Sequence, residues 1–582
     1  MVARRPLLAL ARMSAEQRTV DTWLGDGAVL ATLHLPTIGG ATGVVICPPL
    51  GYEYSVAYRT LRHLADRLAT AGFAAIRFDH AGFGDSMAEP SLDMGARLAA
   101  AELRIAGADR IVYLGLGSGA LVASRHATDD PGAAGLVLWD PAGSGRAWLR
   151  RQSALYTIEV GDVADQAPEG VVEVAGAEFT REFADRIAAL DYDASLAERM
   201  PVLVAVRESS AGPTLPKALR PAKDAVTVLE VPGHEDSLDM SSILASIPAA
   251  SVTVVTDWMR RSFAVGDGVL RVPAPVTTAV VGDLVEELVR FGPHDLFGIV
   301  TRHAWSGSGS WEAPAVVLHN GSAEHRVGAT RHQVELARRL AMRGIRSLRF
   351  DRRGTGESTP VDAHEPSMLF TQAWLDDHAA AVDYLDLPRE RLGVVGMCVG
   401  GWIGLVSRPE SARFVAALAL NDHRVVPQEP LVHRPESGAQ ELAPALRDRL
   451  VAGAKRHLPS GLLAALASRG VLRFAEPNLR RALAAGTDVV VLLGPEDAAV
   501  WRAHGGPAAE RRLRRSGSGS GARARARGSL TVVERASGDH ALYSPGIRSA
   551  ALDLSVELAV REFGLAEAGS PISAGRLRPE RG

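Results

Sequence analysis

A cysteine in the second half of the chain lies in a sequence that could make it a nucleophile. Residues 394–401 read VVGMCVGG, with Cys398 at the centre. This pattern predicts a strand, a Gly-x-Cys-x-Gly turn and a helix, which is the shape of a nucleophile elbow with cysteine in place of serine. Small neighbours let such a strained turn close. The N-terminus of the following helix favours the thiolate form.

The elements that would position this cysteine occur twice. Residues 64–86 and 336–358 are identical at 12 of 23 positions without a gap. Each segment predicts a helix, a glycine turn, a buried strand ending in aspartate (Asp79 or Asp351) and a glycine-rich loop. We expect both aspartates to have structural roles. The offset of 272 residues (351 − 79) indicates a duplicated domain rather than a short repeat.

Strands alternate with helical patterns throughout both halves. This predicts an α/β fold with a mainly parallel sheet, formed twice. A chain of 582 residues is also too long for one ordinary core. We expect the join near residues 265–275, which gives domains 1–268 and 269–582. Helical inserts are expected near 141–200 and 422–486.

Composition excludes several classes of function. Apolar residues make up 47% of the chain and charged residues 23%, with a formal net charge of −3. This balance is typical of a globular protein and gives no reason to propose a nucleic-acid partner. No apolar run reaches about 18 residues, so no membrane span is expected, and the start shows no convincing signal-peptide cleavage site. Two cysteines in so long a chain fit a reducing cytoplasm, and the Ala, Gly and Arg content suggests a high-GC bacterium. Cys47 is expected in a buried strand.

The order of these parts resembles the α/β-hydrolase superfamily, in tandem and over nearly the whole chain. That order is a strand, an oxyanion loop, an Asp-x-x-Gly-x-Gly-x-Ser loop, the elbow, a lid insert, an acid-bearing strand and a histidine. Three segments narrow the resemblance to a bacterial branch of serine-aminopeptidase-like hydrolases, which includes relatives associated with exosortase systems. They are CPPLGYEY (47–54), RFDHAGFGDS (77–86) and SGRAWLR (144–150).

The resemblance implies a catalytic triad in the second copy. Cys398 matches the nucleophile, Asp497 the acid and His540 the base, with Glu496 as the reserve acid. The order nucleophile, acid, histidine is the one that this fold uses. The imidazole would take the thiol proton and later protonate the leaving group, while the carboxylate fixes its tautomer.

Backbone groups would complete the site. The N–H groups of Val399 and of the region around Gly321 are expected to form the oxyanion hole. His319, His325 and His332 lie near that loop, and we expect them at the surface or in the substrate pocket. No carboxylate or thiol lies near them in the sequence at the spacing of metal ligands. We therefore expect neither a metal nor another cofactor.

The first copy has lost its nucleophile. Aligning residues 114–119 (LGLGSG) on the second elbow places Gly117 at the nucleophile position, with Ser118 one residue late. A plausible acid, Glu208, and a matching His234 are still present. We expect a degenerate partner domain, and the alternative is that Ser118 acts as a shifted nucleophile.

A cysteine nucleophile bears on the reaction. A thioester intermediate reacts readily with amines and thiols, which favours acyl transfer, although hydrolysis is also possible. The sequence therefore predicts a hydrolase, thioesterase or acyltransferase that acts on small-molecule or carrier-bound acyl substrates. The alternative from another class is a non-catalytic scaffold in which both copies have decayed.

An arginine-rich insert lies between the predicted acid and histidine. Residues 505–528 contain RRLRR, SGSGSG and ARARAR. We expect a disordered, solvated loop. The functional alternative is docking of an acidic partner such as an acyl carrier protein. RNA is disfavoured because no aromatic residues are interleaved with the arginines.

Overall fold

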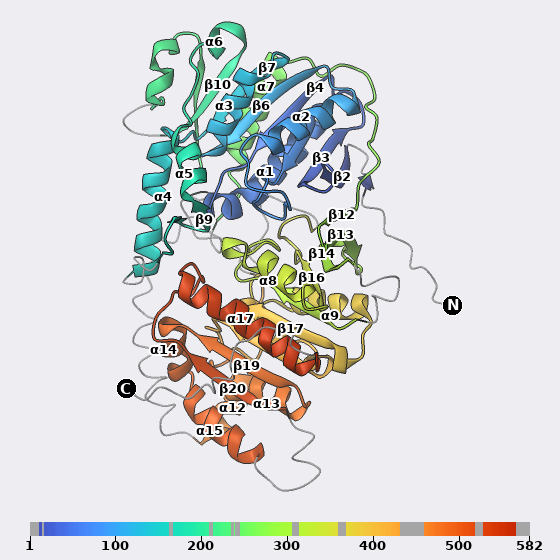
Figure 1. Cartoon of the computed structure of the whole chain (residues 1–582), viewed down its shortest axis with the longest axis vertical. Helices are drawn as coiled ribbons and strands as arrows, with labels where there is room; N and C mark the ends of the chain where they lie inside the picture. Colours follow the sequence, from blue (N-terminus) through green and yellow to red (C-terminus); the bar gives the residue numbers. More distant parts are fainter. Residues whose placement is uncertain are drawn as a thin grey trace, which may run out of the picture.

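The computed structural model describes residues 11–13, 17–161, 167–208, 214–233, 238, 245–304, 313–358, 368–430, 459–517 and 528–565. Within these residues the chain forms two α/β domains. They are stacked along the long axis of the molecule, with the first half of the chain above the second in Figure 1. The predicted α/β class with two mainly parallel sheets is therefore confirmed.

The first domain is built on a nine-stranded sheet. Six of its strands, β5, β4, β6, β7, β10 and β11, run parallel, and β1 to β3 form an antiparallel extension at one edge. Across the sheet the strands are β1 (Ala11–Met13), β2 (Gln17–Leu24), β3 (Val29–Pro36), β5 (Ala74–Phe78), β4 (Thr42–Cys47), β6 (Arg110–Leu116), β7 (Ala133–Trp139), β10 (Val202–Arg207) and β11 (Thr227–Val231).

The second domain repeats this order strand for strand, again with nine strands. The strands are β12 (Thr278–Val281), β13 (Leu284–Phe291), β14 (Leu296–His303), β16 (Arg346–Phe350), β15 (Ala315–His319), β17 (Leu392–Met397), β18 (Phe414–Leu418), β19 (Asp488–Leu493) and β20 (Leu530–Glu534). The central strands read as nearly continuous apolar runs because helices cover both faces of the sheet.

Helices cover each sheet on both sides. The first domain has α1 (Tyr52–Thr70) and α7 (Ala249–Ser262) on one face, and α2 (Met94–Ala106) and α3 (Gly119–Asp129) on the other. In the second domain one face of the sheet is covered by α8 (His332–Ala341) and α17 (Pro545–Glu562). The other face is covered by α10 (Val399–Val406) and α13 (Glu476–Ala484). Helix α9 (Gln372–Leu385) packs on the sheet beside β15. Successive side chains of a strand point to opposite faces of the sheet. Neighbouring residues such as Val44 and Val45 therefore pack into different hydrophobic cores. No helix in the described part of the chain is long and apolar enough to cross a membrane.

Inserts follow the elbow in both domains. The first insert contains α4 (Gly145–Val160), a hairpin of β8 (Val171–Val174) and β9 (Ala177–Thr180), α5 (Arg181–Ala188) and α6 (Leu196–Arg199). The described part of the second contains α12 (Ser460–Ser468) and then α13. Short 3-10 turns are η2 (Lys217–Ala222), η4 (Ala329–Arg331), η5 (Arg389–Arg391) and η6 (Pro409–Ser411).

The arginine-rich insert differs from its prediction. Residues 518–527 lie outside the described part, but the preceding segment is a helix, α15 (Gly506–Gly517), which follows α14 (Pro495–Ala503). Leu513 is buried, and Arg512 makes an ion pair with Glu476 of α13. The prediction of a disordered loop is therefore wrong for α15, because two buried apolar residues, Ala509 and Leu513, and an ion pair dock this basic helix onto its neighbour.

The connection between the domains follows the surface of the first. The chain passes from α7 to β12, and the predicted boundary at 268/269 lies in this connection. Gly39 donates a backbone hydrogen bond to the carbonyl of Gly268 at 2.8 Å, and Leu270 joins the first hydrophobic core.

The two domains exchange equivalent charged residues across their interface. Arg77 of the first domain bonds Glu357 of the second at 2.7 Å, and Arg349 of the second bonds Asp85 of the first at 3.1 Å. Arg77 and Arg349 occupy the same position of the repeat, as do Asp85 and Glu357. Such reciprocal contacts are the mark of an isologous, dimer-like interface.

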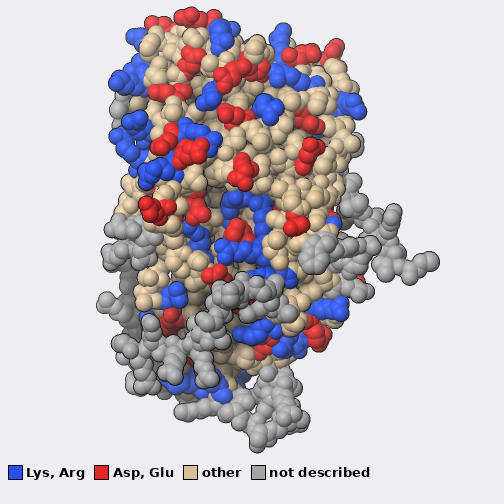
Figure 2. All heavy atoms as spheres, in the orientation of Figure 1, with Lys and Arg blue, Asp and Glu red and all other residues tan. Residues whose placement is uncertain are grey.

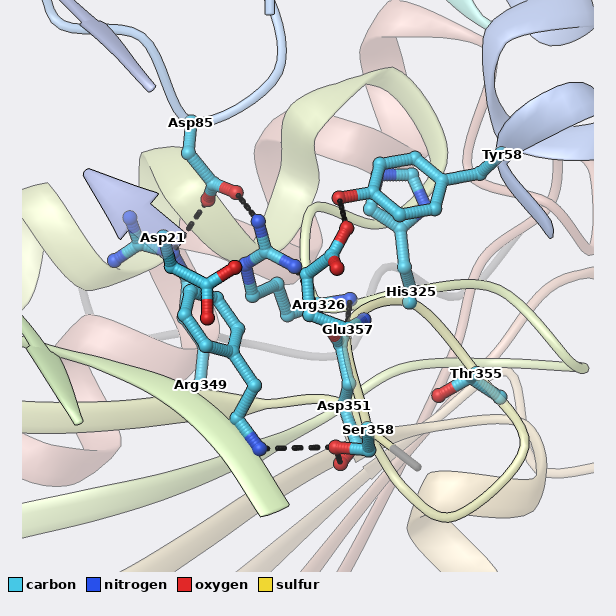
Figure 3. Close-up of polar contacts among 12 residues, drawn as sticks. Asp21, Tyr58, Asp85, His325, Arg326, Arg349, Asp351, Thr355, Glu357 and Ser358 are labelled. Atoms are coloured by element: carbon cyan, nitrogen blue, oxygen red, sulfur yellow. Dashed lines mark hydrogen bonds and ion pairs between the residues drawn. The ribbon is translucent and has the colours of Figure 1, made fainter. Parts of the chain in front are cut away.

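Further buried contacts extend this network, as Figure 3 shows. Arg326 lies between Asp85 and Asp351 and bonds each at 2.7 Å. Tyr58 donates its hydroxyl to Glu357 at 2.8 Å. Removing one member of a buried pair costs several kcal/mol, roughly 3–5, because the other charge stays buried. These contacts therefore fix the two domains firmly against each other.

Candidate active site

The predicted elbow is present in the second domain. Cys398 follows β17 and precedes α10, with φ 51° and ψ −116°. Its amide donates to the Leu418 carbonyl at 2.8 Å. A Cβ added to Gly396 would lie 2.2 Å from the Gly400 carbonyl carbon, so only glycine lets the turn close at Gly396. The thiol is partly exposed, whereas Cys47 is fully buried as expected.

The structure brings the three predicted triad residues together. His540, in the loop after β20, lies with Nδ1 2.6 Å from Oδ1 of Asp497 in the first turn of α14. Asp497 is buried, and the His540 side chain is 29% exposed. Burial lowers the pKa of His540, but hydrogen bonds to Asp497 and to Cys398 outweigh it and raise that pKa to about 11. The reserve acid, Glu496, is exposed.

A fourth side chain, which the sequence analysis missed, joins the thiol to the imidazole. The Cys398 Sγ donates to Oδ1 of Asn421 at 3.5 Å, and Nδ2 of Asn421 donates to Nε2 of His540 at 3.1 Å. In the neutral imidazole this contact makes Nε2 the acceptor and leaves the proton on Nδ1, which donates to Asp497. Asn421 lies just beyond β18, at the carboxyl ends of the strands where α/β proteins form their sites. Its position just after this strand is the sequence feature that could have identified Asn421 as a site residue.

An arginine holds the loop expected to form the oxyanion hole. Arg352 donates to the carbonyls of Asn320, Gly321 and Ser322, at 3.0, 3.3 and 2.8 Å. The carbonyl and N–H of a trans peptide point in opposite directions. The N–H groups of residues 321–323 therefore face away from Arg352.

The loop at Gly321 lies beside the nucleophile position. A Cβ on Gly321 would lie 3.5 Å from the Cβ of Cys398. Val399, the first residue of α10, follows the nucleophile position directly. The loop and Val399 can thus supply converging donors beside Cys398.

In the first domain His80 takes the place of Arg352, and its Nε2 donates a hydrogen bond to the Pro48 carbonyl at 2.9 Å.

The aspartates expected to be structural have that role. Asp351 accepts from the backbone N–H groups of Arg326 and Glu357, each at 2.7 Å. Asp79 accepts from the amide of Asp85 at 2.7 Å. Each aspartate thus ties down the loop that follows its strand.

The expected surface placement of the three histidines near the oxyanion loop is wrong. His319, His325 and His332 are all buried. His319 hydrogen-bonds His378 through Nε2 and Nδ1 at 2.7 Å, and His325 stacks on Tyr58. In the described residues no group of three or more His, Cys, Asp or Glu side chains could hold a metal ion.

The first domain has the same elbow without a nucleophile. Gly117 has φ 59° and donates its amide to the Trp139 carbonyl at 3.0 Å, as Cys398 does to Leu418. Ser118 is buried, and its Oγ accepts a hydrogen bond from the Leu50 amide at 2.9 Å. That bond gives Ser118 a structural role and does not favour the shifted-nucleophile alternative.

A carboxylate fills the space above this empty elbow. A Cβ on Gly117 would lie 2.9 Å from Oε2 of Glu53, and the Ser118 amide also hydrogen-bonds Glu53. Trp148 and Gln152 of the insert donate to the two Glu53 oxygens at 3.0 and 2.9 Å. Glu53 therefore occupies the place that an oxyanion would take.

The other predicted residues of the first-copy site are not assembled in the described structure. Glu208 is exposed, and strand register aligns it with Pro495, two residues before Asp497. His234 lies outside the described residues.

The insert of the first domain reaches the site of the second. Tyr156 and Val160 of α4 pack with Ala329, Ala541 and Tyr543. Ala541 directly follows His540. In Figure 1, α4 runs down from the first domain toward the second. The degenerate domain therefore supplies part of the surface beside the candidate base.

Strand order, elbow and crossover pattern define two α/β-hydrolase-like domains in one chain. No protein-family model matches the sequence, and no curated protein is detectably similar to it. Solved structures of about half the length of the chain do match. Alpha/beta hydrolase domain-containing protein 10 from mouse is 16% identical with a TM-score of 0.27, and the match covers 50% of this chain and 99% of that one.

Two further structures give similar values. Dienelactone hydrolase from Anabaena variabilis is 17% identical with a TM-score of 0.26, covering 47% of this chain and 96% of that one. The acylaminoacyl peptidase of Pyrococcus horikoshii is 13% identical with a TM-score of 0.32, covering 50% of this chain and 43% of that one. The fold class rests on the strand order and elbow described above, and not on these scores.

Proposed function

We propose that the second domain is a hydrolase-type enzyme that opens acyl esters or thioesters through a covalent acyl-cysteine at Cys398. The observation that supports this most directly is the chain of contacts from Asp497 through His540 and Asn421 to the thiol. A carboxylate that orients an imidazole beside a nucleophile is the arrangement that acyl transfer needs.

The first half-reaction forms the acyl-enzyme. His540 takes the thiol proton on Nε2, and Asp497 stabilises the imidazolium. The Cys398 sulfur attacks the acyl carbonyl carbon, and the resulting oxyanion is bound by N–H groups of Val399 and of residues 321–323. The C–O or C–S bond to the leaving group then breaks, and the imidazolium returns its proton to the departing oxygen or sulfur.

The second half-reaction releases the acyl group. Water, an amine or a thiol attacks the thioester carbonyl, His540 accepts the proton of the attacking group, and the imidazolium returns a proton to Cys398 as the C–S bond breaks. Both the thiol and the imidazole are partly exposed, which admits either water or a larger acceptor. Cysteine chemistry favours acceptors with amine or thiol groups, so acyl transfer belongs to the proposal together with hydrolysis.

The expected acidic carrier partner has limited support. In α15 Arg511 and Arg514 are exposed, but Arg514 already pairs with Glu510 at 2.8 Å and Arg512 with Glu476 at 2.5 Å. These internal pairs reduce the charge available to a partner. A small-molecule acyl substrate is the simpler expectation, and a cytoplasmic location stays a prediction.

The test is turnover of acyl esters and acyl thioesters of increasing chain length, with product analysis in water and then with added amine or thiol. We expect wild-type activity to be abolished in Cys398→Ala and retained in the matched Ser118→Ala variant of the first elbow. Acyl capture by the added acceptor identifies a transferase, and free acid alone identifies a hydrolase. Full activity in Cys398→Ala would contradict the proposal and favour the non-catalytic scaffold for this domain.

A further inference from the structure

A cavity of about 520 Å³ lies between the two domains, away from the Cys398 site. Its walls come from the loops at 49–51 and 82–84, from β9 and α5 of the first domain, and from the starts of α8 and α17 of the second. This volume is within the range of small-molecule sites, roughly 300–1,000 Å³. Neither the elbow residues nor the candidate triad line it.

Two buried histidines line this cavity with unpaired ring nitrogens. His332 is 1% exposed, and neither of its nitrogens has a hydrogen-bond partner in the described structure. His80 donates from Nε2 to Pro48, which leaves Nδ1 without a partner among the described residues. Burial lowers the pKa of both to about 4, so both are neutral near pH 7. Unpaired buried polar atoms are costly, and a ligand that bonds them recovers that cost.

Two helix N-termini and the guanidinium group of Arg331 favour an anion in this cavity. His332 begins α8 and Pro545 begins α17, and both residues line the cavity. Helix N-termini attract negative charge. Arg331, Arg339 and Arg548 also line it. In Figure 2 basic side chains gather where the domains meet, at the level of α8 in Figure 1.

Two of the three arginines already have carboxylate partners. Arg548 pairs with Glu173 and Glu178, and Arg339 pairs with Glu335 and Asp553. In the described structure Arg331 makes no ion pair with a carboxylate. Arg331 donates to the carbonyls of Gly82, Gly84 and Ser86, which uses three of its five N–H donors. A carboxylate on a ligand would supply the negative partner that Arg331 lacks.

Part of the cavity lining is aromatic. Phe83, Phe179 and Phe183 contact one another with ring centroids 5.1–5.6 Å apart, and all three line the cavity. Leu50 and Leu552 add aliphatic surface. Such a wall binds an aryl or alkyl body rather than a second charge.

The geometry points to a binding site for an amphipathic organic monoanion, a carboxylate with an aryl or medium-length alkyl body. The carboxylate lies against His332 and the N-termini of α8 and α17, and the apolar body lies against Phe83, Phe179 and Phe183. This site is separate from the acyl-transfer chemistry and does not depend on it.

The test compares three probes that share one body and differ only in the head group: 4-phenylbutyrate, 4-phenyl-1-butanol and 4-phenylbutylammonium. Binding is measured by isothermal titration calorimetry on full-length Cys398→Ala protein, which excludes reaction at the thiol. We expect one carboxylate bound per chain, with the alcohol and the ammonium weaker by at least about tenfold, as loss of a charge-assisted contact predicts.

Two pairs of variants locate the site. Ser549 is an exposed residue on the rim of the cavity, so Ser549→Trp blocks the space without disturbing the core, and Ser549→Ala is its matched control. We expect binding to be lost in the first and kept in the second. His332→Leu weakens the carboxylate about tenfold, and His332→Gln, which keeps a donor, recovers part of the affinity.

Three results would overturn the inference: no carboxylate binding, equal binding of the alcohol, or unchanged binding in Ser549→Trp. Protection of Cys398 from iodoacetamide by 4-phenylbutyrate in the wild-type protein would also overturn it, because the probe would then occupy the catalytic site instead.

Discussion

Gly117 and Cys398 occupy the same position of two matching strand-to-helix turns, with φ 59° and φ 51° and the same backbone hydrogen bond to the neighbouring strand. The first turn has kept the strained geometry and lost the side chain that uses it. Glu53 fills the space above Gly117, while the space beside Cys398 is bordered by Asn421 and His540. One domain is thus closed at its elbow, and the other has a complete candidate triad.

The first elbow should not accept a side chain. Gly117→Ala places a Cβ 2.9 Å from a buried carboxylate oxygen at a positive φ, so we expect a loss of about 1–3 kcal/mol in the free energy of unfolding. Gly282→Ala is the matched control, since Gly282 also has a positive φ of 57° and nothing lies within 4 Å of its added Cβ. Denaturant unfolding measures both. Equal stability of the two variants would mean that Glu53 does not occupy this space.

Asn421 should act as a positioning residue. Asn421→Leu removes the amide that holds His540 Nε2 and the thiol, so we expect kcat to fall at least about tenfold with little change in KM. The pH profile of kcat should shift as well, because the imidazole loses a hydrogen-bond donor at Nε2. Asn421→Gln should restore part of the rate. An unchanged profile in Asn421→Leu would show that the contact has no catalytic role.

Arg352 should be needed for the oxyanion hole rather than for binding. It holds three consecutive carbonyls, and Lys cannot form all three contacts with its shorter, unforked head. We expect Arg352→Lys to lower kcat by up to about 10²-fold, the value of one oxyanion donor. Arg408→Lys changes an exposed ion pair with Asp383 and serves as the control. Equal effects of the two substitutions would contradict this role.

Buried histidines should make the fold sensitive to acid. Burial lowers the pKa of His80, His325, His332 and His378 to about 4. Their folded pKa values lie below the unfolded value, so the unfolded chain binds more protons between about pH 6.5 and 4. The stability they contribute is complete above pH 6.5 and is lost as pH falls toward 4, at up to about 1.4 kcal/mol per pH unit for each histidine.

The measurement is denaturant unfolding between pH 7.5 and 5. His325→Phe keeps the stacking on Tyr58 and removes one titrating group, so its stability should fall less steeply with acid than that of the wild type. Parallel curves for the two proteins would show that His325 does not titrate on unfolding.

The sequence predicted the fold well because duplication made the elements visible twice. The elbow at residues 394–401 and the strand ending at Asp351 each carried a local pattern of apolar runs and glycines. Asn421 had no such pattern, since its role depends on where β18 ends in space. The same reason explains His332, which is buried at the start of α8 near Arg548 of α17, a contact that no local pattern encodes.

Helix α15 shows a second limit. Its arginines suggested a solvated loop, but two buried apolar residues and the pair between Arg512 and Glu476 decide its structure. Composition describes average behaviour, whereas these buried residues and one partner 36 residues away fixed this helix on the domain.

The most direct test of the catalytic proposal is mass mapping of the protein after brief exposure to an activated acyl ester or thioester. The account predicts one acyl group on Cys398, none on Cys47 or Ser118, and strongly slowed acylation in His540→Ala and Asp497→Asn. Equal, slow modification of Cys47 and Cys398, unaffected by His540→Ala, would contradict it.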